Sequence, residues 1–127
     1  MIASLIEKIE EAVSTSRIVV TSSIQKFFGP SKKEAYVTGR LTFVDLSFLQ
    51  FSLFVTEKNR RLVFGKYRYQ YMDTSRKLVF RYDNAPHHKE ISTFPHHKHL
   101  KNVVVASSTP TFEELLEEIS TVILRSS

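Results

Sequence analysis

The chain contains no cysteine among its 127 residues. It can therefore form no disulfide, no thiolate zinc site and no cysteine nucleophile. Any transition metal would have to be held by imidazole and carboxylate groups.

Long apolar runs are missing as well. No stretch approaches the roughly 18 residues that a membrane-spanning helix requires. The N-terminus carries Glu7, Glu10 and Glu11 where a signal peptide would be apolar. We therefore expect a cytoplasmic protein without membrane contact, folded as a single domain over residues 1–127.

Acidic residues are scarce in the middle of the chain. Residues 15–105 hold 16 Lys and Arg against six Asp and Glu, whereas both ends are net acidic. This division suggests a positive face and favours a polyanion such as nucleic acid as the partner. A lysine-rich solvated surface would have the same composition, so charge alone does not decide.

Two segments show helical periodicity, one at each end. In the first, Ser4 with Glu7 matches a capping box; in the second, Pro110 fits the first turn behind Thr109 as a cap. The apolar stripes at helical spacing are Ile2, Leu5, Ile6, Ile9 and Val13, and then Phe112, Leu115, Leu116, Ile119, Val122 and Ile123.

The region between these helices predicts strands. The alternation slips at Asp45–Ser47, which indicates two strands or one bulged strand there, and Asp73–Arg76 predicts a hairpin turn. The fold class we expect is α+β: a single antiparallel sheet of about five strands with the N- and C-terminal helices packed on one face. The predicted strands are 17–29, 35–55, 61–72 and 77–84, with a final strand at 91–94 or 103–105.

The other face of such a sheet would be open. In residues 66–72 the side chains divide by alternation into two sets, and one set would face solvent or a ligand. These sets are Tyr67, Tyr69 and Tyr71 on one side, and Lys66, Arg68, Gln70 and Met72 on the other.

All five histidines fall in a thirteen-residue window, His87–His99, in which the tetrapeptide PHHK occurs twice. Acid–base chemistry is the first interpretation. RNA cleavage without a metal requires a base for the 2′-hydroxyl proton, an acid for the leaving oxygen and a cation at the phosphate. An imidazole changes protonation state near neutral pH, and this interpretation needs no metal or other cofactor.

This interpretation makes a geometric prediction about the two histidine pairs. We predict that the two PHHK copies lie on neighbouring extended segments, with one imidazole of each pair in a shared cleft and the other in the framework. His88 and His97 are the first choice. The candidate catalytic residues are His87, His88, His96, His97, His99 and, as the phosphate clamp, Arg81.

A metal-dependent nuclease is an alternative. His97 and His99 are two residues apart, so on a strand both would point the same way, and Asp83 could supply a third ligand. However, the sequence contains no metal-binding signature of diagnostic spacing, so acid–base chemistry remains the first choice.

A non-enzymatic nucleic-acid-binding module is another alternative. The segments YRYQY and FRYD interleave aromatic and cationic side chains, which suits stacking on unpaired bases and contact with phosphates. The candidate substrate-binding residues are Arg68, Tyr69, Tyr82, Asp83, Asn84 and Lys98.

The segment Leu78–Leu100, with YRYQY upstream and an acidic helix downstream, resembles the TumE family of prokaryotic toxin–antitoxin pairs. The resemblance implies a small cytoplasmic toxin that acts on RNA. It also implies a cognate antitoxin, a DNA-binding protein encoded nearby. The family motif falls on Arg81, Asp83, Asn84, Pro86, His87, His88, Pro95, His96, His97 and His99.

The chain departs from this family pattern at two places. Leu46 stands where the resemblance implies a glycine, and Leu53 or Phe54 stands where it implies an acidic residue. Asp45 or Glu57 are candidates to replace that carboxylate.

Overall fold

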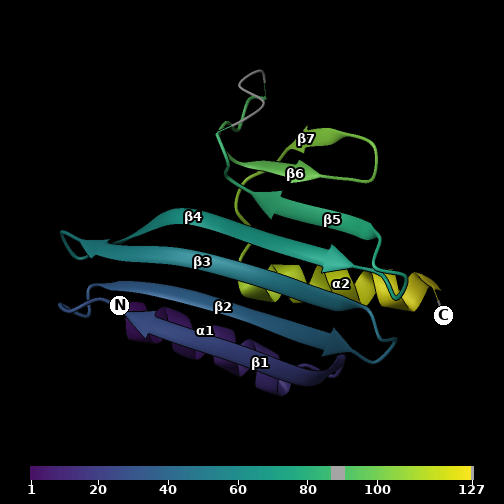
Figure 1. Cartoon of the computed structure of the whole chain (residues 1–127), viewed down its shortest axis with the longest axis horizontal. Coiled ribbons are helices and arrows are strands. Elements are labelled where there is room, and N and C mark those ends of the chain that lie inside the picture. Colours follow the sequence, from purple (N-terminus) through teal and green to yellow (C-terminus); the bar gives the residue numbers. More distant parts are fainter. Residues whose placement is uncertain (87–90, 127) are drawn as a thin grey trace.

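The computed structural model describes residues 1–86 and 91–126, in which seven antiparallel strands form one sheet against two helices (Figure 1). In chain order the elements are α1 (Ile2–Thr15), β1 (Val19–Phe28), β2 (Glu34–Phe43), β3 (Phe48–Lys58), β4 (Arg61–Met72), β5 (Leu78–Asp83), β6 (His97–His99), β7 (Val104–Ala106) and α2 (Phe112–Ser126). No helix of this described part is long and apolar enough to cross a bilayer.

Helix α1 forms because its apolar residues share one stripe. Ile2, Ile6, Ile9 and Val13 are all buried against the sheet, as their spacing predicts. The predicted capping box at Ser4 is wrong, because the helix begins at Ile2 and Ser4 already lies within its first turn.

Helix α2 begins later than the sequence suggested. It starts at Phe112, and a capping box forms at Thr111 instead of a cap at Thr109. The Glu114 N–H donates to Thr111 Oγ1 at 3.1 Å, and the Thr111 N–H donates to Glu114 Oε1 at 2.9 Å. Two N–H groups that the helix leaves without an internal partner are thereby satisfied.

The sheet is a meander in which each strand pairs with the next, in the order β1 to β7. The long run 35–55 divides into β2 and β3 at a turn that contains Leu46, and Asp73–Arg76 makes the turn between β4 and β5. Both of these expectations are confirmed.

The expected number of strands is too low. The structure has seven strands rather than about five within the residues described, because the last part of the sheet consists of two short strands, β6 and β7. Residues 91–94 form a turn rather than a strand, while the alternative at 103–105 overlaps β7.

Both helices cover the same face of the sheet, and the opposite face is open (Figure 1). On the helix side, Phe51 of β3 and Tyr69 of β4 pack edge-on against Phe112 of α2. The alternation in β4 therefore directs Tyr67, Tyr69 and Tyr71 into the core and Arg68 and Gln70 to the open face.

Candidate functional site

Strands β5 and β6 bring four ionisable side chains together. Asp83 lies opposite His97 in the antiparallel register, and Arg81 lies opposite His99. Residues two apart on a strand share a face, and directly opposed residues have neighbouring side chains. All four side chains consequently meet on one side of the β5–β6 pair, and we call them the Asp–His cluster.

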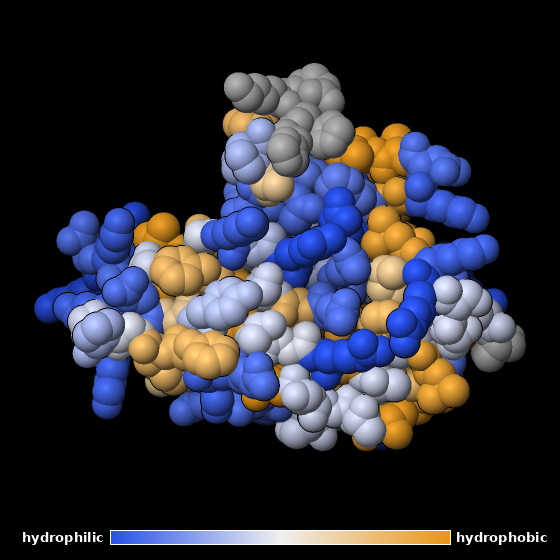
Figure 2. Space-filling model, viewed as in Figure 1, coloured by the Kyte–Doolittle hydropathy of each residue, from blue (hydrophilic) through white to orange (hydrophobic). Residues whose placement is uncertain are grey.

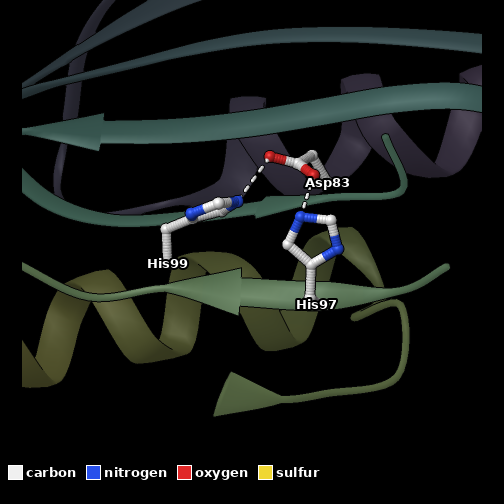
Figure 3. Close-up of side chains that lie close together, drawn as sticks. All are labelled: Asp83, His97 and His99. Carbon is white, nitrogen blue, oxygen red and sulfur yellow. Dashed lines mark ion pairs between the residues drawn. The ribbon is translucent and has the colours of Figure 1, made fainter. Parts of the chain in front are cut away.

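Asp83 is at the centre of the Asp–His cluster (Figure 3). Its Oδ1 lies 2.6 Å from His97 Nε2, and its Oδ2 lies 3.1 Å from His99 Nε2. Arg81 Nε donates to Oδ2 at 2.9 Å, and the Ala85 N–H donates to Oδ1 at 3.2 Å. This carboxylate is buried, and it is held by charge-assisted contacts at both oxygens.

The second nitrogen of His97 has a defined role. His97 Nδ1 lies 2.8 Å from the carbonyl oxygen of Pro95. A carbonyl only accepts hydrogen bonds, so Nδ1 carries the proton and donates it. Both ring nitrogens of His97 are thus engaged, and the side chain is nearly fully buried.

The side chains of the Asp–His cluster differ in their exposure to solvent. The exposed fraction of the side chain is 1% for His97 and 9% for Asp83, but 15% for His99 and 25% for Arg81. The ligand atoms of Asp83, His97 and His99 all lie within 4.8 Å of one another, which is close enough for one ion. The structure therefore brings together the three residues of the metal alternative.

The remaining histidine of the second PHHK copy lies elsewhere. His96 stacks on Tyr67, and its Nδ1 lies 3.0 Å from the Tyr67 hydroxyl and 3.2 Å from Thr109 Oγ1. Burial raises the pKa of Tyr67, and the hydrogen bond from Thr109 only partly offsets this effect. His96 thus belongs to the framework, whereas its neighbour His97 belongs to the Asp–His cluster.

His87 and His88 lie outside the described residues, as do Lys89 and Glu90. The predicted meeting of the two PHHK copies and the choice of His88 therefore remain predictions.

Asn84 has a structural role in the described chain. Its Oδ1 accepts the Tyr67 N–H at 2.9 Å, and its Nδ2 donates to the Gly65 carbonyl at 2.8 Å. The side chain thereby continues the β4–β5 hydrogen bonding past the end of β5, next to the register shift between β3 and β4.

Three predicted substrate-binding residues face the helices. Tyr69 and Tyr82 are buried in the core, and burial raises the pKa of each hydroxyl. Lys98 Nζ lies 2.5 Å from Glu118 of α2. Burial lowers the pKa of Lys98, but its hydrogen bonds with Glu118 and Tyr82 outweigh this effect and the net change is upward. These three side chains join the sheet to α2.

The open face beside the Asp–His cluster is polar and basic. Arg68 is exposed on β4, Arg40 is exposed on β2, and the Arg40 guanidinium lies 4.0 Å from the centre of the Phe48 ring. Arg68 also lines a shallow hollow of about 270 Å³. Hydrophilic side chains cover the middle of this face in Figure 2. The hollow is lined by Thr38, Gly39, Gln50, Phe51, Ser52, Arg68 and Gln70.

A row of exposed aromatic side chains crosses the same face near the β1–β2 and β3–β4 hairpins. Tyr36 lies opposite both Phe27 and Phe54 in the register, and the rings of Phe27 and Tyr36 stack at 6.3 Å. The exposed fractions are 55% for Phe27, 42% for Tyr36 and 36% for Phe54. Apolar colour gathers at this end of the sheet, on the left of Figure 2.

Arg40 and this aromatic row were not among the residues predicted from the sequence. The sequence feature that could have found them is the period-two alternation within β2 and β3. In β2 it assigns Tyr36 and Arg40 to one face and Val37 and Leu41 to the other. Assigning the face required knowledge of which set the helices cover.

These features define a small α+β protein that keeps one sheet face open and carries an ionisable cluster beside that face. A family model described as “Toxin TumE” matches residues 6–126, so the chain belongs to the TumE toxin family. No curated protein and no solved structure gave a match. Membership in a toxin family of this kind implies an antitoxin partner.

Proposed function

We propose that this toxin cleaves RNA, with the Asp–His cluster as its reaction centre. The observation that supports this proposal is the arrangement around Asp83, whose two oxygens contact two imidazoles and an arginine. These groups provide proton transfer and a cation for phosphate, which are the requirements of phosphodiester cleavage. The cluster also lies beside a basic sheet face.

The open face suits single-stranded RNA. Arg40 and Arg68 would contact phosphates, while Phe27, Tyr36 and Phe54 offer rings on which unpaired bases stack. Each stacked base is worth about 1–3 kcal/mol, largely independent of sequence. A strand bound along this face would lead from the aromatic row to the Asp–His cluster.

The exposure of the four side chains suggests which role each has in the cleavage reaction. The substrate would approach from the side of Arg81 and His99, which retain exposed surface, and Arg81 would hold the phosphate. Asp83 and His97 are positioning residues because they are buried. In the reaction, the 2′-oxygen attacks the adjacent phosphorus and the bond to the 5′-oxygen breaks. The cluster takes up the 2′-hydroxyl proton, and a protonated imidazole or water returns a proton to the 5′-oxygen.

The proposed function also includes a protein partner and a place of action in the cell. A toxin that acts on RNA in the cytoplasm needs its reaction centre blocked until it is required. We expect a DNA-binding antitoxin encoded nearby to cover the Asp–His cluster or the edge strand β7 beside it.

The test is cleavage of a labelled single-stranded RNA by the purified protein. Asp83→Asn and His99→Gln should each lower the cleavage rate at least about 100-fold, the usual size of a general acid–base contribution. His96→Gln is the matched control, because this imidazole lies in the framework, and it should retain activity. Full activity in both cluster variants would contradict the proposal.

A non-enzymatic binding function makes a different prediction. In that case the Asp83→Asn variant and the His99→Gln variant would still arrest growth when expressed in cells. A double variant with Arg68→Gln and Arg81→Gln would lose both RNA binding and growth arrest. Comparing growth arrest across these variants separates chemistry from binding.

A further inference from the structure

We propose that Asp83, His97 and His99 bind one divalent first-row transition metal ion. This inference departs from the sequence expectation of a metal-free site. With the ion bound, His97 and His99 would be ligands and would not transfer protons as in the reaction proposed above. The two proposals are therefore tested separately, because metal binding is measured without any RNA. The three ligand atoms already lie within 4.8 Å of one another.

The orientation of His97 gives the first reason. Its Nδ1 lies 2.8 Å from the Pro95 carbonyl oxygen, which turns Nε2 toward Asp83. Nε2 lies 2.6 Å from Asp83 Oδ1, so two potential ligand atoms are already side by side.

The groups around the ligands give the second reason. A histidine that binds a metal usually donates its other ring N–H to a backbone carbonyl or a carboxylate, and a ligating carboxylate is itself hydrogen-bonded. His97 donates Nδ1–H to Pro95, and Asp83 accepts from Arg81 and from the Ala85 N–H. These contacts fix the rotation of both ligands, which lowers the entropy cost of binding an ion.

The donor set indicates the kind of ion. Two imidazoles and one carboxylate suit Zn²⁺ and similar first-row ions, whereas Mg²⁺ and Ca²⁺ prefer sites made of oxygen alone. Among the described residues the group has three ligands, which is the number that a catalytic zinc site uses when it keeps one position open. Water or a phosphate oxygen could take that position from the side of His99, where the Asp–His cluster reaches solvent.

The three ligand atoms must move to equal distances from the ion. Ligands of a tetrahedral zinc ion lie about 3.3 Å apart, given metal–ligand distances of about 2.0–2.1 Å. The structure has 2.6 Å between His97 Nε2 and Asp83 Oδ1 and 3.1 Å between His99 Nε2 and Asp83 Oδ2, and no pair of ligand atoms is more than 4.8 Å apart. Binding would therefore separate His97 from Asp83 and bring the three ligand atoms around a common centre.

The experiment is a calorimetric titration of the chelator-treated full chain with ZnCl₂ at neutral pH. We expect one ion per chain. Binding should be at least tenfold weaker in His97→Gln, in His99→Gln and in Asp83→Asn. A second titration with CoCl₂ should give visible d–d bands of nitrogen and oxygen coordination that these variants lose.

Two controls exclude other histidines. His96→Gln, and separately a double variant of His87→Gln with His88→Gln, should bind zinc with unchanged affinity and stoichiometry. Circular dichroism of every variant verifies folding, and His99→Gln is informative even if His97→Gln unfolds, because His99 is partly exposed.

Two results would overturn the proposal. The first is zinc affinity that survives in folded His99→Gln and Asp83→Asn. The second is a folded wild-type chain that binds neither zinc nor cobalt, which would mean that His97 and Asp83 form an imidazolium–carboxylate pair.

Discussion

Leu46 stands at a backbone position that favours glycine. It lies in the turn between β2 and β3, its φ is 71°, and its side chain is 70% exposed. The left-handed conformation costs a residue with a Cβ roughly 1–2 kcal/mol. The family resemblance implies a glycine at this place, and the structure provides the physical reason for it.

Replacing this residue should therefore stabilise the protein. In Leu46→Gly the strain relief exceeds the added chain entropy of glycine, which is about 0.5–1 kcal/mol, so we expect a net gain of roughly 0.5–1 kcal/mol in the free energy of unfolding. Urea denaturation measures this gain. Leu46→Ala keeps the Cβ and should show no gain; equal stabilisation by alanine would refute the strain argument.

At the scale of single residues, the sequence predicted which side chains of β5 and β6 lie together better than it predicted the framework contacts. The spacing of His97 and His99 placed both on one face, and Asp83 was named as their third partner. The roles of Asn84 and His96 depend on contacts with Gly65, Tyr67 and Thr109, which are distant in the sequence. No local pattern contains that information.

At the scale of elements, α2 provides a test of its N-terminal capping box. Thr111→Ala removes the hydroxyl that accepts the Glu114 N–H. The expected loss is about 1 kcal/mol in the free energy of unfolding, measured by urea denaturation. Thr111→Ser keeps the hydroxyl and should lose much less; an equal loss in both variants would exclude the cap as the cause.

The same capping box makes stability depend on pH. Backbone and side-chain hydrogen bonds with Thr111 lower the pKa of Glu114 from its ordinary value of 4.5. A lowered pKa stabilises the folded state above that ordinary value, and the stabilisation is lost as the pH falls through the folded-state pKa. Glu114→Gln should accordingly be less stable than wild type at neutral pH, and the difference should disappear in acid.

Long elements were predictable from periodicity, and short ones were not. Runs of ten to twelve residues marked β1, β2 and β4, and both helical stripes were confirmed. Strands β6 and β7 have three residues each, too few for a period to appear. Their pairing is set by tertiary contacts, including the bond from Lys98 to α2.

At the scale of the whole molecule, the open face of the sheet is basic. Arg68→Gln should weaken binding of single-stranded RNA at low salt by a similar factor for unrelated sequences, because a phosphate contact is not base-specific. The slope of log affinity against log salt should fall in magnitude by about 0.7, the value for one phosphate contact on a single strand. Fluorescence anisotropy over a salt series measures both effects.

Arg76→Gln is the matched control for this experiment. It changes the net charge by the same amount, but Arg76 lies in the turn between β4 and β5 rather than on the open face. RNA affinity and salt slope should stay close to wild type. If Arg76→Gln and Arg68→Gln behave alike, net charge rather than the open face governs binding.

The meander order of the sheet has a consequence for how the protein is made. Each strand pairs with its neighbour in the chain, so a ribosome delivers the strands in the order in which they add to the sheet. The strands that carry Asp83 and His97 come late, and α2, which closes the core over Tyr69 and holds Lys98, comes last. With the Asp–His cluster as the proposed reaction centre, the nascent chain would be inactive for most of its synthesis, and an antitoxin would have to meet the toxin only once translation is nearly finished.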